Sequence, residues 1–544
     1  MSTWSTKSTL IVSAVVLVWV CMHVVGITYG TQDLPLHQSY VGDEQSPVNG
    51  ALHMLQEKSV LGLRNITTLY YGPVFATLAL PAVVGDFLYQ CVSTRTCSAE
   101  AYRSSVLWDW GGIVILLRVT SVLASILGLY FLYRLFMTRT FNVLQNRSYA
   151  LLGVGLVGCN YYFFEYSHFF KHWLFVIVIL FAQIYLTVRL RETQGKGVLL
   201  WWVHGGLTVM SFGISYISIL YSAAFLPVMY ALWREGDALV RGYLYRYLAG
   251  VFAACLVVLW WHPYAFMRYL GFVGVGGSNN LGDIQNPLAG VGSSWSYYST
   301  EILLNHAPLV LALVILLTVV LRREFRKCVF WLWMFGSVAA ITVLLFAPSV
   351  HHEGRYMLPT LLMLILACVV AYVYAMEKTM LSKQVRAWVL GMFAVYAAFH
   401  VVHVVKWVDI YSDGPPEQQI RSELLEVQQK LENNPIGLVQ GYIFGHVHTK
   451  EAYAAYIEKR GRQDTNLYKA IMETPLPEGV EPLNVRYVWP QEYAPDQSTI
   501  DSYNVVYRLV TPREGEINQF DYMDENILRL WRWDALMPRY ERLR

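Results

Sequence analysis

The sequence predicts an all-α polytopic membrane domain of about eleven transmembrane helices, followed by a small α/β domain. The first observation is composition, because 55% of the 544 residues are hydrophobic and only 15% are charged, unlike the average soluble protein. The second is a series of apolar runs, each long enough to span a bilayer as a helix. The third is a change to polar sequence after residue 406.

The apolar runs alternate with short basic segments that set their orientation. Runs lie at 8–29, 111–137, 148–163, 172–190, 243–261, 301–321, 328–347, 356–376 and 387–406, and residues 197–234 are interpreted as a tight hairpin of two more helices. The first run is too long for a removed signal peptide and lacks a small-residue cleavage site, so it is expected to be a retained span. The positive-inside rule places basic loops such as RLRETQGK and KTMLSKQVR in the cytoplasm.

This orientation places residues 1–406 in a membrane domain and residues 407–544 in an extracytoplasmic soluble domain. Residues 30–110 are expected to form an outer loop with interfacial helices. Its segment 68–90 is apolar enough to span, but its two prolines, two glycines and Asp86 favour a helix at the membrane surface. In the soluble domain, LVQGYIFG and YNVVYRLV are predicted strands.

Charge and cysteine usage exclude some functions. A net charge of +3 is small for this length and the basic residues lie in loops, so nothing indicates nucleic acid as a partner. Only Cys91 and Cys97 lie in polar sequence. Their spacing permits a disulfide if the loop faces an oxidising compartment, and two unpaired thiols remain the alternative.

The adjacent carboxylates Asp43 and Glu44 follow the first span, in the stretch SYVGDEQSPVNG. Loop-forming glycine, proline and asparagine surround them, so a solvated turn is one interpretation. The other is that a carboxylate at the outer membrane edge acts as general base on an acceptor hydroxyl or amine.

Two further polar motifs are predicted on the same face. In YSHFFKHW, the spacing of His168 and Lys171 fits one face of a helix, where they hold a phosphate or orient the base, while interfacial snorkelling of Lys171 stays open. In HHEGRYMLP, Arg355 has the fork of donors that suits a phosphate, with Tyr356 beside it. His351 and His352 add donors, and their spacing is too compact for a strong zinc signature.

The order of these features resembles the GT-C glycosyltransferases. The features are a first span, the outer Asp–Glu pair, YYGP at 70–73, a polar motif at the head of a middle span, an aromatic-rich outer loop, and RYMLP at 355–359. Within this class the chain is most similar to the branch of protein O-mannosyltransferases and lipid A aminoarabinose transferases. The resemblance covers about residues 8–406 and depends on the order and shared sidedness of the motifs.

The resemblance implies a sugar donor carried on a polyprenyl phosphate and transfer outside the cytoplasm. Asp43 would be the catalytic base with Glu44 its neighbour, Arg355 would bind the donor phosphate, and Tyr71 would line the site. The chain departs from the family pattern twice. It has His168 and Lys171 where many members carry an aspartate, and a glycine precedes its single Pro73 where a tandem proline is usual.

The predicted function is therefore an integral glycosyltransferase of a plasma (inner) membrane, acting on a glycan, lipid or protein acceptor among membrane lipids. No cofactor or metal ligand set is assigned, and a divalent cation is left open. A lipid-linked glycan transporter or flippase is an alternative, but only Arg118 is expected inside a span and no internal repeat is visible. A catalytically silent scaffold that binds a partner through its outer domain is another.

Overall fold

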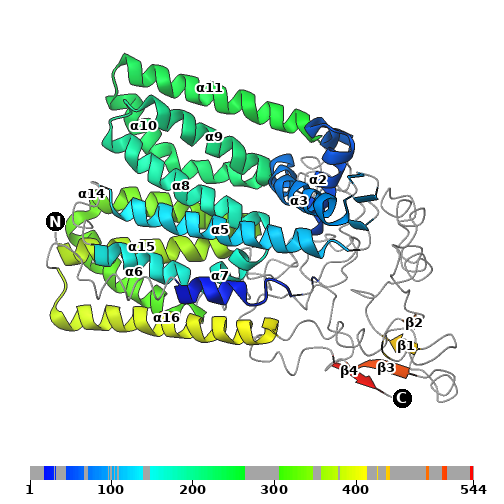
Figure 1. Cartoon of the computed structure of the whole chain (residues 1–544). Coiled ribbons are helices and arrows are strands. Elements are labelled where there is room, and N and C mark those ends of the chain that lie inside the picture. Colours follow the sequence, from blue (N-terminus) through cyan, green and yellow to red (C-terminus); the bar gives the residue numbers. More distant parts are fainter. Residues whose placement is uncertain are drawn as a thin grey trace, which may run out of the picture.

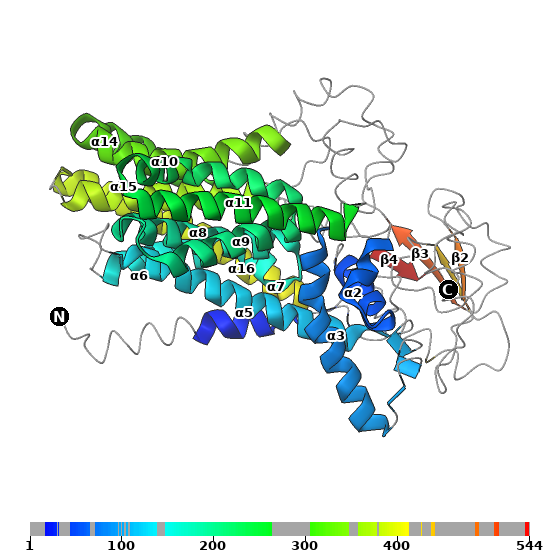
Figure 2. The same cartoon turned by 90° about the horizontal axis from the view of Figure 1, so that it is seen from above.

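The computed structural model of the chain consists of a long helical bundle with a small sheet beyond one end (Figures 1 and 2). It describes residues 17–31, 44–65, 71–138, 147–263, 305–346, 357–377 and 380–412 apart from short gaps, residue 426, and four later strands. Among these residues, seven helices are long and apolar enough to cross a membrane, by length and composition. The membrane domain is thus all-α and polytopic, as predicted.

The first half of the bundle surrounds a buried central helix. Its elements are α5 (Gly111–Phe136), α6 (Arg147–Gly158), α7 (Tyr161–His168), α8 (His172–Glu192), α9 (Val198–Ile214), η3 (Tyr216–Phe225), α10 (Leu226–Glu235) and α11 (Ala238–Trp261). Helix α8 packs against α5 and α9, and 89% of its apolar window is buried. The predicted hairpin at 197–234 is confirmed as α9 followed by η3 and α10.

Helices at the end of the bundle near the sheet belong to the predicted outer loop. They are α2 (Gln45–Gln56), the 3-10 helix η1 (Val60–Asn65) and α3 (Pro73–Thr94). In Figure 2, α3 runs away from the side of the bundle, and in Figure 1 it is seen nearly end-on, so its axis lies across the bundle helices. Helix α3 is also one of the seven helices that are long and apolar enough to span, so its interfacial placement stays a prediction.

Helix α14 (Ala307–Phe346) covers two predicted spans and folds back on itself. Two hydrogen bonds join α14 to α15 (Leu358–Glu377). The Cys368 thiol of α15 donates to the Leu309 carbonyl of α14, and the Thr360 hydroxyl of α15 donates to the Ala339 carbonyl of α14. A straight helix would separate Leu309 from Ala339 by about 45 Å, whereas Thr360 and Cys368 lie about 12 Å apart along α15. The two apolar stretches, Ala307–Leu321 and Phe330–Leu344, therefore lie side by side, as two spans require.

Helix α16 (Lys383–Ser412) is the last of the described bundle helices and precedes the strands in the sequence. The strands β1 (Gly437–Gln440), β2 (Val485–Val488), β3 (Val505–Val510) and β4 (Arg539–Arg542) form a sheet in the order β2-β1-β3-β4. Strand β1 pairs in parallel with β2 and β3, and β3 pairs antiparallel with β4. Strand β1 overlaps the start of the predicted segment LVQGYIFG, and β3 lies within the predicted segment YNVVYRLV. Parallel pairs need long crossover connections, which suits the predicted α/β domain.

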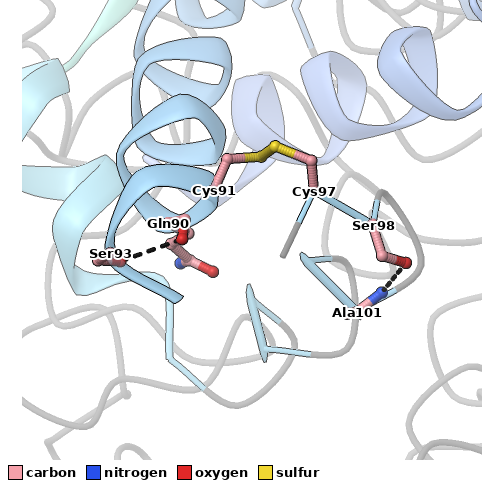
Figure 3. The surroundings of a disulfide bond; sticks show 6 residues. All are labelled: Gln90, Cys91, Ser93, Cys97, Ser98 and Ala101. Carbon is pink, nitrogen blue, oxygen red and sulfur yellow. Dashed lines mark hydrogen bonds between the residues drawn. A yellow bond between two sulfur atoms is a disulfide. The ribbon is translucent and has the colours of Figure 1, made fainter. Parts of the chain in front are cut away.

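A disulfide closes the far end of α3. Cys91, in the last turns of the helix, is bonded to Cys97, which follows the left-handed C-cap residue Arg95 (Figure 3). Of the two alternatives left open by the sequence, the structure therefore has the disulfide.

Candidate functional site

Glu44 begins α2 and is almost fully buried, with 1% of its side chain exposed. Its Oε1 accepts hydrogen bonds from Arg118 Nε at 3.2 Å and from the Phe170 backbone N–H at 3.1 Å, and its Oε2 accepts from Arg118 Nη2 at 3.0 Å. The ion pair is bidentate, the geometry in which an arginine fork matches a carboxylate best. Glu44 thus connects the outer loop both to α5 and to the segment before α8.

Arg118 fixes a third segment to the same place. Its Nη1 donates to the carbonyls of Ile27 at 2.9 Å and Tyr29 at 2.7 Å, where the first span ends. The guanidinium also lies 5.2 Å from the centre of the Phe169 ring. Every nitrogen of this buried cation has a partner, so the burial penalty of its charge is offset. The sequence placed Arg118 within a span but did not assign it to the site, although an intramembrane charge is itself a signal of function.

The segment between α7 and α8 brings two more predicted residues to this end of the bundle. Lys171 is buried at the N-cap of α8, with its ammonium 5.1 Å from the centre of the Tyr166 ring. The Tyr71 ring lies 4.1 Å from the ring of His172, the residue after Lys171. The segments that carry Tyr71 and Lys171 are therefore in contact.

The expectation that His168 and Lys171 share one face of a helix is wrong. Helix α7 ends at His168, its C-cap Phe169 is extended, and Lys171 caps the next helix. The short helix is started by Asn160, whose side chain accepts from the Phe163 N–H. The chain then turns through residues 169–171, and in that turn the Phe170 N–H reaches Glu44 instead of continuing a helical ladder.

His168 faces the interior, between the rings of Trp407 at 4.5 Å and His23 at 5.7 Å. Burial, aided by His23 and by the cation of Arg118, lowers the pKa of His168 well below its usual value. The imidazole is therefore uncharged at neutral pH.

Gly72 has a structural reason to be glycine. Its N–H donates to the Ile214 carbonyl at 3.1 Å, and a Cβ at this position would clash with the Gly213 carbonyl oxygen. A second proline, which has no N–H, would lose this bond and meet the same backbone. The departure from a tandem proline therefore follows from the close approach of α9 to the start of α3.

Gly72→Ala is expected to lower the thermal unfolding midpoint of the purified protein, because the clash is with backbone that cannot rotate away. Overpacking of this kind costs about 1–3 kcal/mol. Gly155→Ala is the matched control, since a Cβ at Gly155 meets nothing within 4 Å. Equal midpoints for the two variants would show that the approach of α9 to Gly72 is not as tight as described.

The remaining predicted site residues lie outside the described residues. They are Asp43, His351, His352, Arg355 and Tyr356. Within the part of the chain that the structure describes, no three histidine, cysteine, aspartate or glutamate side chains gather in a way that could hold a metal ion.

No protein-family model and no curated protein matches the chain. Among solved structures, the chain is similar to ArnT from Cupriavidus metallidurans in the apo state. The TM-score is 0.45 and the sequence identity 13%, over 80% of this chain and 83% of that chain.

Proposed function

We propose that the chain is an integral membrane glycosyltransferase that moves a sugar from a polyprenyl-phosphate donor to an acceptor on the extracytoplasmic face. The observation that supports this most is the contact of Glu44 with Arg118 and the Phe170 N–H. It joins the acidic loop to the Lys171 segment, two features that the sequence analysis assigned separately to one site, and Arg118 also binds the end of the first span.

In this proposal Asp43, the residue before Glu44, is the general base. Its carboxylate takes the proton from an acceptor hydroxyl or amine as that group attacks the anomeric carbon. The bond between the anomeric carbon and the phosphate oxygen breaks, and the electron pair leaves with the polyprenyl phosphate. Inversion at the anomeric carbon follows from attack opposite the leaving group.

Lys171 and Arg355 are proposed to bind the donor phosphate. Negative charge develops on the phosphate as the glycosidic bond breaks, so fixed cations stabilise the transition state more than the ground state. Glu44 has a positioning role, because its carboxylate accepts three hydrogen bonds, two from Arg118 and one from the Phe170 N–H. It holds the start of α2 at the end of the first span.

The extracytoplasmic placement is supported by the Cys91–Cys97 disulfide, since such bonds persist in oxidising compartments. In intact cells, a membrane-impermeant maleimide is expected to label these cysteines only after treatment with an impermeant reductant. The Cys91→Ser, Cys97→Ser double variant is the control and should lose that labelling. Labelling that requires permeabilised cells would place α3 on the cytoplasmic side and contradict the proposed orientation.

The donor can be identified by mass spectrometry of membrane lipids from cells with and without the gene. A polyprenyl-phosphate sugar is expected to accumulate when the protein is absent, because its consumption stops. Identical lipid profiles would contradict the transferase proposal and favour a silent scaffold.

A further inference from the structure

An open groove of about 310 Å³ lies between α9 and α11, away from the candidate site. On α9, the groove is lined by Val198 and by the residues three, four, seven, eight and eleven positions after it. On α11, it is lined by Tyr243 and by residues at the same spacings after it. These spacings describe one stripe along each helix. Both helices start at the same end of the bundle, so the groove extends from that end toward the middle (Figure 1).

Glycines create the space in the groove. A Cβ added at Gly206 or at Gly250 would meet nothing within 4 Å, although both residues line the groove. At Gly205 the helices are in closer contact, since a Cβ there would lie 3.3 Å from the Tyr247 ring. The two helices are therefore in contact at Gly205 and are separated at Gly206 and Gly250.

Buried polar contacts hold the walls of the groove in place. The Tyr247 hydroxyl lies 3.1 Å from Nδ1 of His204, whose Nε2 lies 3.1 Å from the Thr187 hydroxyl. Trp201 donates from its indole nitrogen to the Gly195 carbonyl at 2.8 Å. Tyr247 and Trp201 both line the groove, so its shape is set before any ligand arrives.

The groove faces the lipid side of the bundle. Only 11% of the apolar window of α11 is buried, and α11 is the edge helix in Figure 1. Trp202, which lines the groove, is 65% exposed, as is typical of aromatic residues near a membrane surface. In a bilayer, the molecules that meet such an exposed apolar surface are lipids.

One exposed cation lines this apolar groove. Arg246 lies eight residues after the start of α11, about 12 Å along the helix, within snorkelling distance of the membrane surface. Lys196 lies two residues before Val198 and is also exposed. Basic groups beside grooves between membrane helices, on the cytoplasmic side predicted here, are suited to anionic lipid head groups.

We propose that this groove is a binding site for an anionic phospholipid. One acyl chain lies over Gly206 and Gly250, and the phosphate pairs with the guanidinium of Arg246. The site is separate from the proposed transferase site and does not depend on that function.

The test uses the full-length protein, purified in mild detergent and stripped of lipid, with phosphatidylglycerol and phosphatidylcholine as probes. Binding is measured by native mass spectrometry. The wild type is expected to bind phosphatidylglycerol in preference to phosphatidylcholine. Gly206→Leu and Gly250→Leu fill the groove and are expected to abolish the bound lipid. Arg246→Gln is expected to reduce the preference for phosphatidylglycerol about fivefold, as the loss of one cation near a membrane surface implies.

Two controls distinguish this site from general effects. Gly242→Leu adds the same side chain to α11 at another open position outside the groove lining, and Arg241→Gln removes a neighbouring cation outside it. Both controls should bind phosphatidylglycerol like the wild type. The proposal is overturned if the groove variants also bind like the wild type, if they release a polyprenyl phosphate instead, or if they dissociate a dimer without changing bound lipid.

Discussion

Arg118→Gln is expected to destabilise the protein by about 3–5 kcal/mol, the usual cost of removing one partner from a buried ion pair. The substitution leaves the Glu44 carboxylate in a buried position without its cation and removes the donors to the Ile27 and Tyr29 carbonyls. The first span, α2 and α5 lose their common contact. The measurement is the thermal unfolding midpoint in detergent, with donor turnover followed in parallel, and both are expected to fall.

Arg134→Gln is the matched control for this prediction, because Arg134 lies on the same helix but is exposed. It is expected to change the midpoint little. The double variant Glu44→Gln, Arg118→Gln removes both charges and is expected to be more stable than Arg118→Gln alone, since no unpaired charge remains buried. An Arg118→Gln midpoint equal to that of Arg134→Gln would show that the ion pair does not support the site.

Asp43→Asn is expected to lower the transfer rate by about 10² to 10⁴, because an amide cannot accept the proton from the acceptor. Its unfolding midpoint is expected to match the wild type, since the substitution keeps the size and shape of the side chain. Asp409→Asn is the control, as Asp409 is exposed on α16 and pairs only with Lys406 at 3.4 Å among the ion pairs described. Asp43→Asn and Arg118→Gln thus differ in outcome, because only the second lowers both stability and rate.

The course of the membrane domain could be predicted from hydropathy and charge. Most predicted crossings that lie within the described residues coincide with an apolar helix, including the α9 hairpin and the two apolar stretches of α14. Local composition was sufficient because a bilayer core leaves the backbone few alternatives to a helix of about 20 residues. The prolines and glycines of α3 predicted a helix placed differently from the bundle helices, and the axis of α3 lies across them (Figures 1 and 2).

The contacts of the site could not be predicted in the same way. Glu44 and Arg118 are 74 residues apart, and nothing local specifies which carboxylate a buried arginine will meet. The spacing of His168 and Lys171 gave a wrong prediction of a shared helix face. Helical periodicity assumes an unbroken helix, and α7 ends at His168, before Lys171. The role of Gly72 depends on Gly213, which belongs to a helix more than a hundred residues later.

Catalysis by Asp43 of transfer from a polyprenyl-phosphate sugar can be tested by comparing the membrane lipids of four strains. These strains lack the gene or carry the wild type, Asp43→Asn or Asp409→Asn at equal protein level. If Asp43 is the base, the same polyprenyl-phosphate sugar accumulates in the null and Asp43→Asn strains and stays low in the other two. A lipid profile of Asp43→Asn equal to that of the wild type would contradict it.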